Sequence, residues 1–268
     1  MAAPPLRIDL HTHILPGVDD GVPTEDEAVE FARMAFDDGI RVCVATPHCK
    51  EGFYVNDRPA VLSAVDRLTL RLKQERIELK LEPGAEVHIC PDLVERVRDG
   101  RAPTLADNGT TLLLELSLTQ YPVELENLVF QLKLAGLEVL LAHPERIRFF
   151  QDDVTRLESV IRLGAYGQIT TGSILGVFGR TTRTFSEELL RKELVHVVAS
   201  DAHGTGGRPP VISESIEAMI PIVGEARARS MAYEAPAALL EGRGPELPPI
   251  PTRPPRRRFG WPPWRPRG

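Results

Sequence analysis

The sequence predicts an α/β fold in which parallel strands carry covering helices, arranged either as a barrel or as an open sheet. Apolar segments of strand length alternate with amphipathic segments of helix length about seven times along the chain. The second strand, 41–46, is apolar almost throughout, which is typical of a parallel sheet that is buried on both faces. In both arrangements, ligands bind at the carboxyl ends of the strands.

The periodicity of the apolar residues places the individual elements. The first strand covers 6–10, and a capping box of Thr24 and Glu27 begins the first helix. That helix has apolar residues at i, i+3, i+4 and i+7 from Ala28 and ends at Asp38-Gly39. Further strands are expected at 41–46, 78–81, 85–89, 112–116, 138–142, 165–169 and 196–200. Further helices are expected near 57–75, 91–98, 123–135, 153–163, 182–192, 211–220 and 223–233.

The composition is that of an ordinary globular protein, with 268 residues of which 42% are hydrophobic and 26% charged. No apolar run approaches the ~20 residues that a membrane helix needs, and the N-terminal residues do not form a secretory signal. The three cysteines, at 43, 49 and 90, form no Cys-x-x-Cys motif. We therefore expect a protein of the reducing cytoplasm.

The net charge of −6 is distributed unevenly. Residues 244–268 hold six arginines and one glutamate, a net +5, which leaves −11 for residues 1–243. An acidic body argues against nucleic-acid binding. Nine of the last 25 residues are proline, so we expect a domain at 1–243 followed by a disordered Pro/Arg-rich tail at 244–268. The tail is either simply solvated or a docking segment for an acidic protein or an anionic membrane surface.

Histidine and carboxylate side chains recur at the predicted strand ends. His11 and His13 alternate along the first strand, so their imidazoles point to the same side. Glu115 lies within an apolar strand, where a buried acid costs several kcal/mol unless it is compensated. His88 and His196 are expected to stay outside the site, His196 because it begins its strand. The candidate metal ligands are His11, His13, Asp20, His48, Glu86, Glu115, His143, Asp201 and His203.

A set of this size suits two or three metal ions rather than one. Mixed imidazole and carboxylate ligands favour manganese, iron, zinc or cobalt over magnesium or calcium. Three divalent ions, four carboxylates and a bridging hydroxide leave a small positive charge, which suits an anionic substrate. Arg146 and Arg208 are candidates to bind phosphate oxygens through two parallel hydrogen bonds each.

Seven motifs carry a family resemblance. They are Ile8-Asp9-Leu10-His11-Thr12-His13, Val18-Asp19-Asp20-Gly21, Thr46-Pro47-His48, Pro83-Gly84-Ala85-Glu86, Glu115-Leu116-Ser117, Ala142-His143-Pro144-Glu145-Arg146 and Ala199-Ser200-Asp201-Ala202-His203. Over roughly residues 6–240 the chain resembles the polymerase-and-histidinol-phosphatase (PHP) superfamily, and within it the bacterial capsular-polysaccharide-type protein-tyrosine phosphatases. The resemblance implies a distorted (β/α)7 barrel of the PHP type, with a trinuclear and usually manganese-dependent site at the C-terminal ends of the strands.

The resemblance also implies how the ligands are shared. One ion would be held by His11, His13, Glu86 and Asp201. A second would be held by Glu86 as a bridge, with Glu115 and His143, and the third by Asp20, His48 and His203. Arg146 and Arg208 match the arginines expected to bind phosphate. One departure is Ala235-Pro236-Ala237, where the family usually has an Asn-Pro-Arg-like turn.

The implied activity is hydrolysis of phosphotyrosine in protein by a metal-bridging hydroxide, in the regulation of exopolysaccharide or capsule synthesis. The implied partner is a bacterial tyrosine autokinase. One alternative is a PHP phosphatase for a small phosphomonoester such as histidinol phosphate, and another is a non-catalytic metal-binding regulator. The aromatic loop residues are candidates either to bind an aryl ring or to pack, and they are Phe53, Tyr54, Tyr121, Phe149 and Phe150.

Residues 90–96 match the Cys-x5-Arg pattern of cysteine-dependent tyrosine phosphatases. That chemistry needs free backbone amides around the phosphate and a thiol of low pKa. Pro91 offers no N–H, while Asp92 and Glu95 would repel phosphate and raise the pKa of the Cys90 thiol. The sequence therefore predicts that Cys90 is not a nucleophile.

Overall fold

The computed structural model describes residues 6–250, and residues 1–5 and 251–268 lie outside the described part of the chain. All pairs of named strands within it are parallel. One sheet has the order β1 (Arg7–Thr12), β2 (Ile40–Ala45) and β4 (Lys80–Pro83). The second has the order β3 (His48–Cys49), β5 (Glu86–His88), β6 (Thr111–Glu115), β7 (Glu138–Leu141), β8 (Tyr166–Thr170) and β9 (Val197–Ala199).

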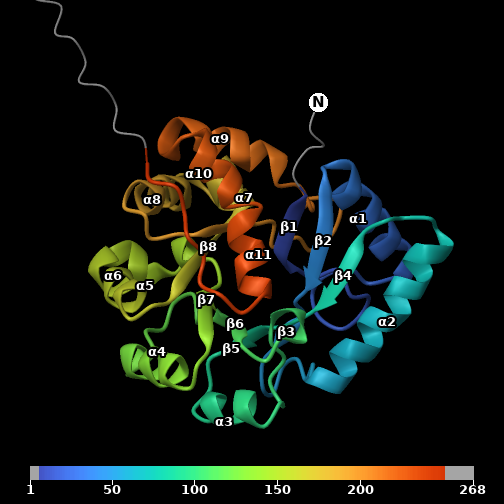
Figure 1. Ribbon diagram of the computed structural model, residues 1–268, viewed down its shortest axis with the longest axis horizontal. Coiled ribbons are helices and arrows are strands. Elements are labelled where there is room, and N and C mark those ends of the chain that lie inside the picture. The colour runs from blue at the N-terminus through green and yellow to red at the C-terminus, as the bar shows by residue number, and fades with distance from the viewer. Residues whose placement is uncertain (1–5, 251–268) are drawn as a thin grey trace, which may run out of the picture.

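The two sheets form one curled layer (Figure 1). β3 follows β2, and β5 follows β4, after only short interruptions, so each of these pairs occupies one strand position. The layer closes where the backbone N–H of Asp201 donates to the carbonyl of His11 at 2.9 Å and that of His13 donates to the carbonyl of Ala202 at 2.9 Å. The result is the distorted (β/α)7 barrel that the resemblance implied.

Helices surround this barrel (Figure 1). Thr24 caps α1 as predicted, because its hydroxyl accepts from the backbone N–H of Glu27 at 3.3 Å. The buried face of α1 includes Ala28, Phe31, Ala32 and Ala35, as its periodicity predicted. The long helices on the outside are α1 (Glu25–Asp37), α2 (Arg58–Gln74), α4 (Leu125–Leu134), α6 (Val154–Arg162), α8 (Arg180–Arg191) and α9 (Ser213–Val223). The shorter ones are α3 (Leu93–Arg98), α5 (Arg148–Asp152), α7 (Thr171–Leu175), α10 (Glu225–Ser230) and α11 (Glu234–Leu240).

The barrel interior is apolar and is closed at one end by α11. Leu10, Val44, Leu113, Leu140 and Val197 belong to one buried cluster that also contains Ala235 and Leu239 of α11. The Thr111 hydroxyl, at the start of β6, donates to the carbonyl of Leu239 at 2.6 Å. The helix therefore covers the N-terminal ends of the strands. α11 was not predicted from the sequence, because seven residues are too few to show a helical pattern of apolar residues. The apolar residues that it packs against also lie far away in the sequence.

The short helices α5 and α7 were also not predicted. α7 follows the end of β8 directly, and α5 follows the end of β7 after a short 3-10 turn at Pro144–Arg146. A single turn of helix leaves no periodic apolar pattern that could be recognised from the sequence.

The segment predicted to begin the tail is partly packed onto the body. Leu247 and Ile250 lie against the main core, and the Arg227 guanidinium donates to the carbonyl of Pro248 at 2.9 Å. Residues 247, 248 and 250 thus contact the body, and the boundary between domain and tail at residue 244 stays a prediction. The remainder of the predicted tail, 251–268, lies outside the described residues.

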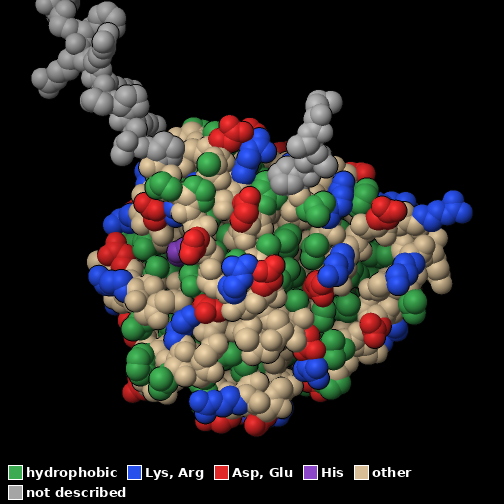
Figure 2. Space-filling view, in the orientation of Figure 1, with side chains coloured by type: hydrophobic (Ala, Val, Ile, Leu, Met, Phe, Trp, Pro, Cys, Tyr) green, Lys and Arg blue, Asp and Glu red, His purple; other side chains and the backbone are tan. Residues whose placement is uncertain are grey.

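The surface carries mixed charge. Figure 2 shows acidic and basic side chains interspersed over the face in view. Among the described helices, none combines the length and the apolar character that a membrane crossing requires.

Candidate metal centre

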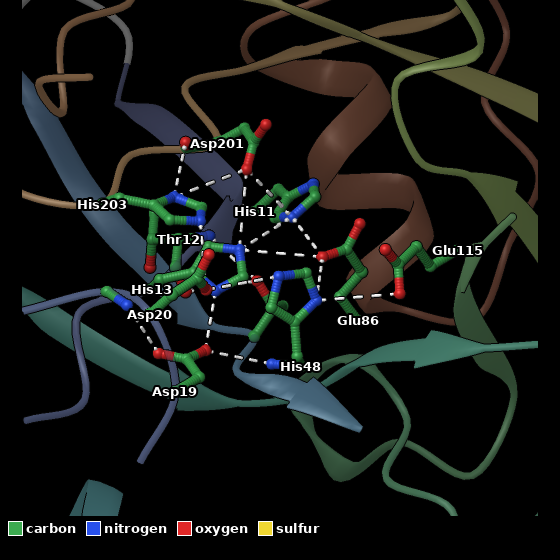
Figure 3. Close-up of polar contacts among 12 residues, drawn as sticks. His11, Thr12, His13, Asp19, Asp20, His48, Glu86, Glu115, Asp201 and His203 are labelled. Atoms are coloured by element: carbon green, nitrogen blue, oxygen red, sulfur yellow. Dashed lines mark hydrogen bonds and ion pairs between the residues drawn. The ribbon is translucent and has the colours of Figure 1, made fainter. Parts of the chain in front are cut away.

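The structure brings the nine predicted ligands together at the carboxyl ends of the strands. The close-up of this region labels all of them except His143 (Figure 3). Every strand position except that of β8 contributes at least one of them from the strand or from the loop that follows, so residues separated by up to 192 positions in the sequence become neighbours. The nine are His11, His13, Asp20, His48, Glu86, Glu115, His143, Asp201 and His203.

His11 and His13 direct their Nε2 atoms at each other, 3.2 Å apart. The Nδ1 atom of His11 lies 3.0 Å from the side-chain oxygen of Gln168, and Nδ1 of His13 lies 2.7 Å from a carboxylate oxygen of Asp19. Since each Nδ1–H has an acceptor, each neutral ring presents a lone pair on Nε2. Two lone pairs this close repel unless a cation lies beside them, so this pair fits a metal ion.

Glu86 lies at the middle of the cluster and is fully buried. Its Oε1 atom is 2.8 Å from Nε2 of His143, and its Oε2 atom is 3.4 Å from Nε2 of His11. Oε2 also lies 2.8 Å from Nδ1 of His48, yet neither atom has hydrogen-bond geometry to a described residue. Buried polar atoms without a partner are rare and need an explanation. Both atoms fit a shared divalent cation.

The candidate ligand atoms form three overlapping groups, each within a span of 4.8 Å. The groups are His11, His13 and Asp201; His13, Asp20, His48 and His203; and His48, Glu86 and Glu115. This grouping differs from the predicted one at two histidines. His48, predicted to bind only with Asp20 and His203, also lies near Glu86 and Glu115. His13, predicted to bind with His11, also lies near Asp20, His48 and His203. The distribution of ligands over individual ions stays a prediction.

The imidazoles and carboxylates of this cluster shift one another's pKa values. Burial lowers the pKa of His48, but the carboxylates of Glu115 and Glu86 outweigh this effect and raise it to about 11. Burial raises the pKa of Glu115, but the neighbouring imidazoles of His48 and His88 outweigh this effect and lower the pKa to about 2. Protons therefore occupy the site when metal does not, and metal binding must displace them.

Two of the candidate ligands have unusual backbone conformations. His143 has φ 34° and Asp201 has φ 52°, in the left-handed region that non-glycine residues seldom adopt. Each is the second residue after the end of a strand, β7 for His143 and β9 for Asp201. Strain of this kind persists where the surrounding structure enforces it, most often at functional sites.

Both predicted arginines contact Asp201. Nη1 of Arg146 lies 2.7 Å and Nη2 of Arg208 lies 2.5 Å from the same atom, Oδ2 of Asp201. The other oxygen, Oδ1, lies 3.4 Å from Nε2 of His11 and 3.5 Å from Nε2 of His13. Asp201 thus joins the guanidinium pair to the histidine cluster, so an anion bound by the arginines would lie beside the metal site.

Three residues that hydrogen-bond to candidate ligands were not predicted from the sequence, namely Asp19, Gln168 and His88. Asp19 accepts hydrogen bonds from His13 and from the backbone of His48, and Gln168 contacts His11. Gln168 is a polar residue in an apolar strand, the same signal that identified Glu115. His88 was expected outside the site, and this expectation was wrong, because its Nδ1 atom lies 3.0 Å from Oε2 of Glu115.

His196 lies outside the candidate site, as expected. Its Nδ1 atom accepts from the backbone N–H of Gly167 at 3.2 Å, and its ring meets the ring of Tyr166 edge-on.

The Cys90 environment does not suit a nucleophile. Burial raises the pKa of the Cys90 thiol to about 11, which outweighs the opposite effect of Arg96. The Arg96 guanidinium is itself paired with Asp92 and Glu51, at 2.8 Å each. Cys90 instead lines a cavity of about 600 Å³ together with Tyr54.

Of the candidate aryl-binding residues, one lies against a metal-site histidine. The ring of Tyr54 stacks on that of His48 with centroids 5.6 Å apart. Phe149 and Phe150 are buried, and Tyr121 packs edge-on against Phe149. Phe53 is exposed. Packing therefore accounts for most of this aromatic set.

Comparison with known proteins assigns the family. A family model described as capsular polysaccharide synthesis, CpsB/CapC, matches residues 7–241. The chain belongs to the CpsB/CapC family. A tyrosine-protein phosphatase from Bacillus subtilis (strain 168), YwqE, is 38% identical over 201 residues, covering 75% of this chain and 79% of the relative. A putative tyrosine-protein phosphatase from Staphylococcus aureus, CapC, is 31% identical over 207 residues, covering 77% and 81%.

Solved structures agree with this membership of the CpsB/CapC family. One comes from a study of YwqE from Bacillus subtilis and CpsB from Streptococcus pneumoniae, described as unique metal-dependent tyrosine phosphatases. It superposes with a TM-score of 0.85 at 35% identity and covers 92% of this chain and 99% of that one. The phosphotriesterase homology protein from Escherichia coli has a TM-score of 0.51 at 13% identity, covering 88% of this chain and 96% of that one, and therefore shares the fold alone.

Proposed function

We propose that this CpsB/CapC protein is a metal-dependent protein-tyrosine phosphatase that acts in the regulation of capsule or exopolysaccharide synthesis. The observation that carries the proposal is Asp201, which faces the converging histidines with one oxygen and both arginines with the other. That arrangement combines a cation site with an anion site. The names of the relatives and of the superposed structures support the same activity.

In this proposal the nine clustered residues hold two or three divalent ions, with manganese as the expected metal and iron, zinc or cobalt as alternatives. When bound, the ions supply Lewis acidity, which neutralises phosphoryl charge and makes hydroxide available near neutral pH. Gln168 and Asp19 hold the rings of His11 and His13 through Nδ1, which would leave each Nε2 atom available to an ion.

Arg146 and Arg208 bind the phosphoryl oxygens in this proposal. The Nε atom of Arg208 is buried and has no hydrogen-bond partner among the described residues, so this donor remains free for an oxygen of the substrate. A phenolate leaving group, with a pKa near ~10, needs less protonation than an alkoxide. The chain therefore does not require a strong general acid for an aryl phosphate, and we assign none.

The proposed physiological substrate is a phosphotyrosine protein, with a bacterial tyrosine autokinase as the expected partner in the cytoplasm. Contact of the basic tail with an anionic membrane surface is a further proposal. It concerns the tail at 244–268, of which residues 251–268 lie outside the described part of the chain. Deleting that segment should weaken binding to anionic vesicles or to the kinase, and unchanged binding would contradict the proposal.

Metal analysis of the purified protein together with a substrate panel tests the activity. We expect bound divalent metal, turnover of phosphotyrosyl peptides and loss of that turnover with a chelator. Preference for histidinol phosphate would favour a small-molecule phosphatase instead. Metal binding without turnover of any aryl phosphate in added manganese would favour a non-catalytic regulator.

A further inference from the structure

We propose that Phe178 is a positioning residue whose ring fixes the guanidinium groups of Arg146 and Arg208 for binding phosphoryl oxygens. The inference rests on the proposed function, in which these two arginines hold the phosphoryl group. The guanidinium carbon of Arg146 lies 4.4 Å from the centroid of the Phe178 ring, and that of Arg208 lies 5.8 Å from it. Both distances fall within the ~6 Å range of a cation–π interaction.

The two arginines need more than Asp201 to hold them in place. Each contacts Oδ2 of Asp201 through a single terminal nitrogen, at 2.7 Å for Arg146 and 2.5 Å for Arg208. A guanidinium held at one nitrogen can still pivot, and two cations around one carboxylate oxygen repel each other. The electron-rich face of an aromatic ring attracts both cations and limits their rotation. Phe178 therefore supplies the second contact that the pair requires.

The loop that carries Phe178 has a defined conformation. It connects α7 to α8, and its glycines Gly176 and Gly179 have φ values of +87° and +89°, which favour glycine over other residues. The backbone N–H of Val177 donates to the carbonyl of Gly172 at 2.8 Å, and that of Gly179 donates to Gly176 at 3.1 Å. These hydrogen bonds fold the loop back onto α7 and hold Phe178 at one position.

The ring rests directly on Gly172. A Cβ atom at this position would lie 2.9 Å from Cε2 of Phe178, closer than side-chain contacts allow, and 3.4 Å from Cζ. A methyl group at residue 172 would therefore push the ring away from its present place. Among the hydrogen bonds and ion pairs of the described residues, none joins Gly172 to either arginine. Gly172→Ala therefore displaces the ring while leaving the guanidinium groups chemically intact.

Binding of inorganic phosphate to the metal-loaded full chain tests this inference. Dissociation constants for phosphate come from calorimetry, and KM and kcat come from p-nitrophenyl phosphate. We expect Phe178→Leu to weaken phosphate binding about three- to tenfold, the range that one or two cation–π contacts give. Gly172→Ala should weaken it in the same direction, and KM should rise in parallel. Val177→Ala is the matched control in the same loop, since Val177 is 59% exposed, and it should bind phosphate like the wild type.

Phosphate affinity equal to wild type in a folded, metal-loaded Phe178→Leu protein would overturn the inference. A rise in KM for the aryl phosphate with unchanged phosphate affinity would also overturn it, because the ring would then contact the leaving group. If Phe178→Leu fails to fold, Gly172→Ala decides by the same two measurements. Absence of turnover in the wild type would instead contradict the proposed function. The phosphate dissociation constants of the wild type and Phe178→Leu would still show whether Phe178 helps Arg146 and Arg208 to bind phosphate.

Discussion

Replacing Asp19 by Asn should weaken metal binding while the fold is kept. The Asp19 side chain is fully buried and accepts three hydrogen bonds. Its Oδ2 atom accepts from Nδ1 of His13 at 2.7 Å and from the backbone N–H of His48 at 3.0 Å. Its Oδ1 atom accepts from the backbone N–H of Gly21 at 2.9 Å. One carboxylate thus orients an imidazole and fixes the start of β3, where His48 lies.

An asparagine at this position cannot satisfy all three donors. With its oxygen in the place of Oδ2, its amide group faces the N–H of Gly21, and with the reverse orientation it faces both His13 and the N–H of His48. At least one hydrogen bond to a charged acceptor is lost, and each such bond contributes about 1.5–3 kcal/mol. Loss of a carboxylate behind a ligating histidine typically costs about 10–100-fold in metal affinity. We expect a reduction in that range.

Competition with a chelating dye measures the metal affinity, and thermal unfolding reports on the fold. Asp26→Asn is a suitable control, because the Asp26 side chain is 88% exposed and, within residues 6–250, pairs only with Arg71 at the surface. It should leave metal affinity unchanged. If folded Asp19→Asn binds metal as tightly as the wild type, Asp19 does not set the orientation of His13. The hydrogen bond at Nδ1 of His13 would then not be the reason why its Nε2 atom is available to a metal ion.

Three further predictions concern other parts of the chain. His11→Ala should lower metal content and turnover together, with circular dichroism unchanged; retained metal would remove His11 from the ligands. Cys90→Ser should keep phosphatase activity, whereas a chelator should abolish it, and the opposite pair of results would support thiol chemistry. Burial and Arg227 lower the pKa of His196 to about 4. As pH falls below the unfolded value of ~6.5, the unfolded state therefore gains the proton first, and stability is lost until about pH 4. Between pH 8 and pH 5, the free energy of unfolding of the wild type, measured with denaturant, should fall by about 2 kcal/mol more than that of His196→Asn. Equal decreases would contradict the lowered pKa of His196.

The sequence by itself determined the strands and the residues at their ends. The alternation of His11 and His13 places both on one side of a strand, because successive side chains point to opposite faces. The acid within the apolar strand around Glu115 indicated a compensated site, because a buried carboxylate is costly. Both patterns can be recognised because the residues that form them are adjacent in the sequence. The same local patterns placed most of the long helices within a few residues.

The tertiary structure alone decided which distant side chains touch. Asp19 behind His13, Gln168 behind His11 and Phe178 beside two arginines are contacts between segments that no local period connects. The seven residues of α11 form a helix whose apolar side is buried at the end of the barrel, a partner that exists only after the strands have assembled. Periodicity reports the direction of a side chain relative to its own element, whereas contacts depend on how the elements pack.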